Sequence, residues 1–185
     1  MTQPPIPCRT ALVLGGARSG KSRYAQALAE SFVGEWVFVA TAQALDEEMA
    51  ERIARHRQDR DARWRTREEP LDLVAVLRAE AHPGRVVVVD CLTLWLSNLM
   101  HARRSAEAEV AGLAAAVVTL EAPAIFVSNE VGLGIAPAHA LGREFRDVQG
   151  RANAALAGVC DVVVSMNAGL PVLVKPGPRP NLRLA

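Results

Sequence analysis

The sequence predicts a single α/β domain with a mostly parallel central sheet flanked by helices. Its 185 residues fit one domain, and half of them are hydrophobic, which is ample for a core. Along the chain, β-rich runs alternate with helical ones, as in parallel α/β folds. Uninterrupted valine runs further indicate strands buried on both faces. The expected strands are 10–14, 36–40, 85–90, 124–128 and 161–166.

The expected helices are 21–32, 46–58, 71–80, 92–101, 106–120 and 139–158. A last strand at 170–174 follows too short a link for a parallel crossover, so we expect it to pair antiparallel at one edge. Prolines cluster near both ends of the chain, where they cannot donate to a strand ladder. We therefore expect one nucleotide-binding domain over 1–185, with flexible ends at about 1–8 and 176–185.

The first strand leads into a glycine-rich loop that opens a helical run. This is the pattern G-x-x-x-x-G-K-S between strand and helix, the P-loop in its required context. Its backbone N–H groups can converge on a phosphate, and the helix N-terminus adds partial positive charge. Lys21 is expected to reach the β- and γ-phosphates, and Ser22 to hold Mg²⁺. The loop that should bind a nucleoside triphosphate, in a RecA-like P-loop NTPase fold, is Gly15-Gly16-Ala17-Arg18-Ser19-Gly20-Lys21-Ser22.

Ligands of such sheets bind outside the carboxyl ends of the strands. Asp90 ends a run of four valines and is interpreted as the second magnesium-ordering residue; capping the helix that starts near Leu92 is the alternative. Asn129-Glu130, followed by glycines, either lines an acceptor pocket or serves only a turn. The guanine-reading motif N-K-x-D is absent, so the residues themselves give no base preference.

The segment 52–67 carries seven arginines and two acids. Such a run is either a solvated charged face or, next to a triphosphate, a set of phosphate clamps. His56 lies within it, on the same helical face as Met49 and Ile53. The spacing leaves two roles open for His56, a histidine at the edge of the core and a catalytic group.

Composition limits the remaining function classes. A net charge of +1 argues against a broad nucleic-acid-binding surface. The three cysteines are widely separated, which suggests small buried side chains in a reducing compartment. No run is long enough for a membrane span and the start does not read as a signal peptide, so a cytoplasmic location is expected.

Taken together, the motifs resemble the bifunctional adenosylcobinamide kinase / adenosylcobinamide-phosphate guanylyltransferase family of cobalamin biosynthesis. The resemblance extends over nearly the whole chain, and the later motifs make it specific. The residues that carry it are the P-loop with Arg23, Ala40-Thr41-Ala42, Asp46-Glu47-Glu48-Met49-Ala50, Arg52-Ile53, His56-Arg57-x-x-Arg60-x-x-x-Trp64-x-Thr66-x-Glu68, Asn129-Glu130-Val131-Gly132-Leu133-Gly134-Ile135-x-Pro137 and Phe145-Arg146-Asp147-x-x-Gly150-Arg151-x-Asn153.

The resemblance implies two reactions. A triphosphate, ATP or GTP, phosphorylates the aminopropanol hydroxyl of adenosylcobinamide. GTP then gives its GMP moiety to adenosylcobinamide phosphate, through a GMP–histidine intermediate that falls on His56. The resemblance further implies a homotrimer. It also implies nucleotide contacts at Ala40, Thr41, Ala42, Arg57, Gln58, Asp59, Arg60 and Glu68, beside Asp90 and the P-loop.

Two positions depart from the family pattern. Asp61 stands where the family often has proline, and Asp90 where some members have glutamate; neither change removes a needed group. Two other functions remain open: a small-molecule kinase without guanylyl transfer, and a nucleotide-switch or assembly ATPase. Neither of them requires the constellation from His56 to Glu68.

Overall fold

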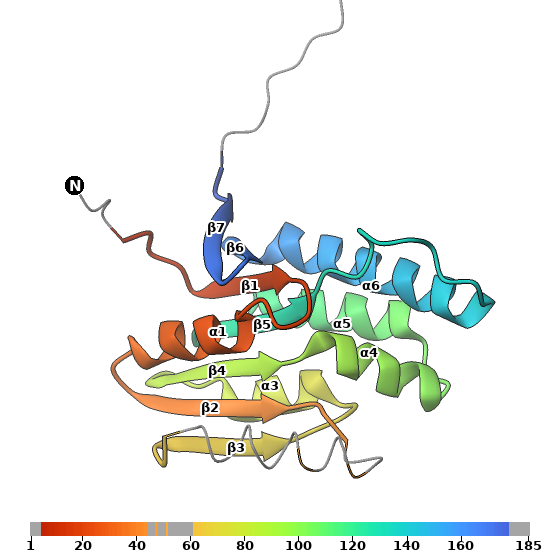
Figure 1. Ribbon diagram of the computed structural model, residues 1–185. Helices are drawn as coiled ribbons and strands as arrows, with labels where there is room; N and C mark the ends of the chain where they lie inside the picture. The colour runs from red at the N-terminus through yellow and green to blue at the C-terminus, as the bar shows by residue number, and fades with distance from the viewer. Residues whose placement is uncertain (1–4, 44–46, 48–50, 52–60, 178–185) are drawn as a thin grey trace, which may run out of the picture.

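A computed structural model describes residues 5–43, 47, 51 and 61–177. Within this part of the chain, seven strands form one sheet in the order β3-β2-β4-β5-β1-β6-β7 (Figure 1). Every pairing is parallel except that of β7 with β6. The strands are β1 (Thr10–Gly15), β2 (Glu35–Ala40), β3 (Trp64–Glu68), β4 (Arg85–Asp90), β5 (Ala124–Asn129), β6 (Val162–Asn167) and β7 (Leu170–Lys175).

Five helices of the described residues accompany the sheet. None of them is long and apolar enough to cross a membrane. Their bounds are α1 (Lys21–Glu30), α3 (Leu73–Glu80), α4 (Leu92–His101), α5 (Ala106–Val118) and α6 (Ala140–Val159).

The predicted α/β class and the antiparallel edge strand are confirmed. The helix expected at 46–58 falls mostly outside the described residues. The strand β3 was not predicted, because its sequence WRTRE has one apolar residue and reads as part of the arginine-rich run. It forms by parallel pairing with β2, where Trp36 faces Trp64. The helix expected from residue 71 begins at Leu73, since Glu69 Oε1 accepts from the N–H groups of Leu71 and Asp72 in the preceding turn.

Side chains that alternate along the strands build two separate cores. On one face, Ala25 and Ala29 of α1 pack against every second residue of each strand, such as Val13 of β1 and Val88 of β4. On the other face, α3, α4, α5 and α6 cover the strand residues that alternate with these, such as Val87 of β4 and Phe126 of β5. Each strand is therefore buried on both sides in the middle of the sheet, as the valine runs predicted.

The cysteines only partly match the prediction of small buried side chains. Cys160 is buried and Cys91 half-buried, but Cys8 is exposed ahead of β1. Burial raises the pKa of the Cys91 thiol to about 11 and that of Cys160 to about 12. Both thiols are therefore protonated near neutral pH and act as small apolar groups.

Candidate functional site

The P-loop connects the carboxyl end of β1 to the first turn of α1, and its shape depends on two glycines. Gly20 takes a φ of +89° immediately before α1. Gly15 has a φ of +152°, and a Cβ on it would lie 2.7 Å from the backbone oxygen of Met166 and 2.7 Å from Ser19 Oγ. A larger residue at Gly15 would clash with these atoms, and one at Gly20 would be strained by the positive φ. The chain therefore makes the tight turn that presents backbone N–H groups at the start of a helix.

Lys21 lies in this loop as a buried cation. Its side chain is 7% exposed, and Nζ donates to the carbonyl oxygen of Gly16 at 2.6 Å. Burial lowers the pKa of Lys21, and the negative charge of the nearby Asp90 partly offsets that effect. Because the ammonium has two protons beyond the one donated to Gly16, it can also donate to phosphate oxygens.

Ser19 adds an unsatisfied group to the same loop. Its hydroxyl oxygen is buried and has no hydrogen-bond partner among the described residues. A buried hydroxyl without a partner is costly. A phosphate oxygen bound within the loop would satisfy it, so the local chemistry fits an anion.

The register of the sheet brings several predicted residues to one edge. Ala40 at the end of β2 is opposite both Glu68 of β3 and Asp90 of β4. Alternation along each strand gives Asp90 the parity of Val86 and Val88, on the face covered by α1. Ala40 packs against the same core, and Glu68 shares the parity of Trp64. These three residues therefore lie at the same edge of the sheet as the P-loop and on the same face as α1.

Thr41 has a different environment from Ala40. It is fully buried, and its hydroxyl donates to the carbonyl of Cys91 at 2.7 Å and accepts from the N–H of Cys91 at 2.9 Å. Its own carbonyl accepts from Asn98 Nδ2 at 2.8 Å. Thr41 thus joins the end of β2 to the turn that follows Asp90, and its hydroxyl is fully committed to the backbone.

The end of β5 carries a buried polar network that sequence reasoning missed. Ser128 Oγ donates to Asn153 Oδ1 at 2.6 Å, and Gln149 Nε2 donates to both of these oxygens. Asn153 Nδ2 in turn donates to the carbonyl of Asn129 at 3.0 Å. Asn153 belongs to the motif quoted above, whereas no pattern in the sequence pointed to Gln149 or Ser128.

Five predicted residues, His56, Arg57, Gln58, Asp59 and Arg60, lie outside the described residues. The described arginines nearby have structural partners. Arg63 pairs with Asp61, whose pKa it lowers, and it stacks over the Trp36 ring at 4.3 Å. Arg65 pairs with the buried Glu80. These two arginines therefore form a paired charged face.

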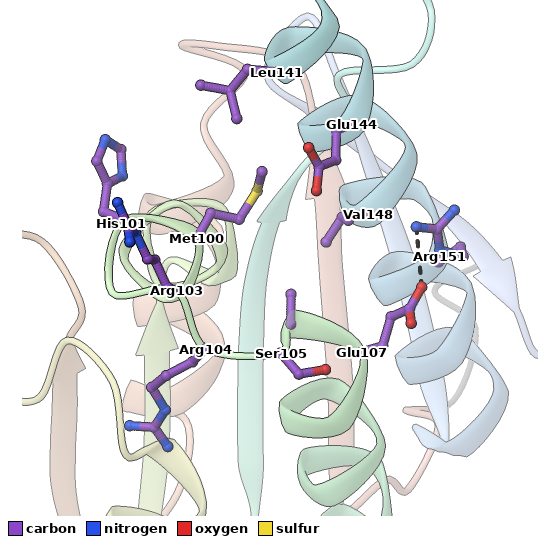
Figure 2. A pocket seen from close by; sticks show the side chains of 11 residues that line it. Met100, His101, Arg103, Arg104, Ser105, Glu107, Leu141, Glu144, Val148 and Arg151 are labelled. Carbon is purple, nitrogen blue, oxygen red and sulfur yellow. Dashed lines mark ion pairs between the residues drawn. The ribbon is translucent and has the colours of Figure 1, made fainter.

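A cavity of about 610 Å³ lies between the end of α4, the start of α5 and the first half of α6 (Figure 2). Met100 and Val148 supply apolar surface, while Arg151 pairs with Glu107 at 3.4 Å across one side. None of the described residues predicted to bind nucleotide contributes to its lining. The cavity is therefore separate from the P-loop site.

Comparisons with known proteins find similarity over nearly the whole chain. The sequence profile described as cobinamide kinase / cobinamide phosphate guanyltransferase matches residues 11–174. The chain is 47% identical over 169 residues to the bifunctional adenosylcobalamin biosynthesis protein CobP of Pseudomonas aeruginosa, covering 90% of this chain and 98% of that protein. It is 38% identical over 179 residues to the bifunctional adenosylcobalamin biosynthesis protein CobU of Escherichia coli, covering 89% and 98%. The protein of the same name from Salmonella typhimurium gives the same identity and coverage.

Proposed function

The chain belongs to the cobinamide kinase / cobinamide phosphate guanyltransferase family, and we propose that it carries out both reactions at the edge where β1, β2 and β4 end. It first phosphorylates adenosylcobinamide with ATP or GTP. It then transfers GMP from GTP to adenosylcobinamide phosphate and releases pyrophosphate. The observation that carries this proposal is the P-loop with its buried Lys21 and unsatisfied Ser19 hydroxyl, in a chain that is similar to bifunctional relatives over nearly its whole length.

The phosphate-binding part of the mechanism rests on described residues. The loop N–H groups and Lys21 hold the β- and γ-phosphates, and the Ser19 hydroxyl donates to one of their oxygens. Ser22 in the first turn of α1 and Asp90 at the end of β4 would hold Mg²⁺. The described residues form no cluster of three or more ligating side chains. Two oxygen donors nevertheless suit this ion, which takes its other ligands from phosphates and water. Bound there, Mg²⁺ would neutralise the charge that develops on the leaving phosphate.

The guanylyl-transfer part rests on His56. A neutral imidazole nitrogen attacks the α-phosphorus, the bond from that phosphorus to the bridging oxygen breaks, and pyrophosphate leaves with the electron pair. The resulting N–P bond is then broken by an oxygen of the acceptor's phosphate, which restores the imidazole. His56 belongs to the connection from β2 to β3, two adjacent parallel strands.

We propose further that the protein is a cytoplasmic homotrimer. The edge strand β7 supports an assembly, because Leu170, Val172, Leu173 and Val174 are each at least 44% exposed in the single chain. An unpaired edge with apolar side chains favours contact with another chain. Sedimentation of the purified protein at several concentrations tests the trimer, and a monomer at micromolar concentration would contradict it.

The covalent step is tested with Mg²⁺ and GTP labelled at the α-phosphate. A phosphoramidate is stable in alkali and labile in acid, so the denatured wild-type protein should retain alkali-stable label that acid removes. His56→Ala should retain none, whereas the matched control His101→Ala, at the exposed end of α4, should be labelled like the wild type. Absence of label on a wild-type protein that still binds GTP would refute guanylyl transfer through His56 and favour a simple kinase.

A further inference from the structure

We infer that Asn129 is a substrate-positioning residue of the phosphoryl-transfer step: its carboxamide orients the acceptor hydroxyl against the γ-phosphate. The inference rests on the proposed kinase activity and assigns a role within it. The backbone of Asn129 is held on both sides, whereas its side chain has no hydrogen-bond partner among the described residues.

The backbone of Asn129 is fixed by two side chains from different helices. Its N–H donates to Thr93 Oγ1 of α4 at 3.0 Å, and its carbonyl accepts from Asn153 Nδ2 of α6 at 3.0 Å. Asn153 is itself held by Ser128 and Gln149 in the buried network. The next residue is also anchored, because the N–H of Glu130 donates to the carbonyl of Gly15 at 3.0 Å. A residue held in this way has a defined Cα–Cβ direction.

That direction follows from alternation along β5. Ser128 points to α6, and Ile125 and Val127 point to the core on the α1 face. Asn129 shares the parity of Ile125 and Val127, so its carboxamide faces the side of α1 and the P-loop. It is half-buried there, and its amide oxygen and nitrogen make no hydrogen bond to a described residue. A polar group with a fixed backbone and free hydrogen-bonding capacity is available to a ligand.

The position of Asn129 between the nucleotide-binding strands selects the part of the ligand that it meets. β5 lies between β1 and β4, and Asn129 is the register partner of Gly15, the first P-loop residue. Paired strands are about 4.8 Å apart. Asp90 is the partner of Val127, so Asn129 extends two residues, about 6.6 Å, beyond Asp90 towards the ligand side. This places the carboxamide between the phosphate loop and the expected magnesium carboxylate, where the γ-phosphate meets the acceptor.

A carboxamide suits this position because it combines a donor and an acceptor. Nδ2 donates to a γ-phosphate oxygen, and Oδ1 accepts from the acceptor hydroxyl, which holds the two reactants in line. The acceptor oxygen forms a bond to the γ-phosphorus, and the bond to the bridging oxygen breaks with its electron pair on the nucleoside diphosphate. The hydroxyl proton passes to the transferred phosphoryl group and then to water. The amide keeps its protons throughout, so Asn129 is a positioning residue.

The test separates the two reactions of the enzyme. We expect Asn129→Ala to lower kcat for phosphorylation of adenosylcobinamide at least about 100-fold, because correct positioning contributes factors of this size. Its KM for the nucleotide should change little. Labelling by α-labelled GTP, and GMP transfer to adenosylcobinamide phosphate supplied ready-made, should stay within about threefold of the wild type. Asn129→Asp keeps the acceptor oxygen, loses the donor and adds charge, so it should not rescue phosphorylation.

The matched control is Asn167→Ala. Asn167 also ends a strand beside β1, but on the other side of it, and its exposed side chain donates to Ser165 Oγ. This variant should phosphorylate the acceptor at the wild-type rate. Equal losses in Asn129→Ala and Asn167→Ala, or equal losses of both reactions in Asn129→Ala, would overturn the inference. A wild-type protein that phosphorylates no adenosylcobinamide would instead refute the proposed function itself.

Discussion

Thr41 provides a sharp test of how the ligand edge of the sheet is held together. Its hydroxyl satisfies the N–H of Cys91 and adds a second partner to the Cys91 carbonyl, which also accepts from the N–H of Trp95 at 3.2 Å. The site is fully buried, so water cannot replace the hydroxyl. Thr41→Val keeps the shape and removes the polar group. The N–H of Cys91 would then lose its acceptor, while its carbonyl would keep one partner.

The expected cost follows from that asymmetry. A buried donor left without a partner costs about 1–3 kcal/mol, and the carbonyl adds little because it stays bonded. We therefore expect a loss of about 2 kcal/mol in the free energy of unfolding, or a fall in Tm of about 4–8 °C for a chain of this size. Urea unfolding followed by circular dichroism measures the first quantity, and calorimetry the second.

The matched control is Thr119→Val. Thr119 is exposed at the end of α5, where its hydroxyl donates only to the carbonyl of Ala116. Its replacement should change stability by less than about 0.5 kcal/mol. A Thr41→Val protein as stable as the wild type would refute the reasoning. So would an affinity for GTP that falls more than about tenfold with intact stability, because the hydroxyl would then contact nucleotide directly.

Two further predictions concern stability away from the site. In α6, Gly142→Ala should destabilise the protein although alanine favours helices by about 1 kcal/mol, because the new Cβ would lie 2.8 Å from Pro137 Cβ; Gly150→Ala, which meets nothing within 4 Å, should stabilise it by about 0.5–1 kcal/mol. Opposite signs in urea unfolding are expected, and a gain in both variants would contradict the steric argument. At the start of β1, the N–H groups of Thr10 and Arg9 donate to Asp161 and lower the pKa of its carboxyl. Its stabilisation is therefore complete above the unfolded pKa of about 3.9 and is lost as pH falls through the lower folded value. Asp161→Asn should cost about 1 kcal/mol at pH 7, and the difference from the wild type should shrink towards pH 3; a difference independent of pH would show that the charge has no role.

Much of the fold was predictable because its signals are local. Valine runs such as Val86–Val89 identify strands that are buried on both faces, and a short link before Leu170 requires an antiparallel return. The strand β3 had no such signal. Only Trp64 of its five residues is buried, so its strand character comes from pairing with β2 rather than from its own pattern.

The candidate site was predictable to a similar extent. Glycine spacing locates the P-loop, and the position after a valine run locates Asp90. Successive side chains of a strand point to opposite faces of the sheet. This alternation could also have predicted that Ala40 faces α1 whereas Thr41, whose hydroxyl bonds within the protein, does not. The contacts of Asn153 and Gln149 with Ser128 were not predictable. They depend on how α6 packs against β5, and these residues are more than twenty positions apart in the sequence.

The two proposed reactions break different bonds of a nucleotide. The bond that breaks determines which parts of the chain can act in each reaction. The P-loop would hold the β- and γ-phosphates. The γ-phosphorus is attacked in the first reaction, and both phosphates leave together as pyrophosphate in the second. A nucleophile for the α-phosphorus must approach opposite that leaving group, so it cannot come from the P-loop strand itself. Another part of the chain must supply it, which is the role proposed for His56. Groups that face the γ-phosphate, such as Asn129, can then serve the first reaction alone. Lys21 would contribute to both reactions, so its loss would not tell them apart, whereas variants of His56 and Asn129 would.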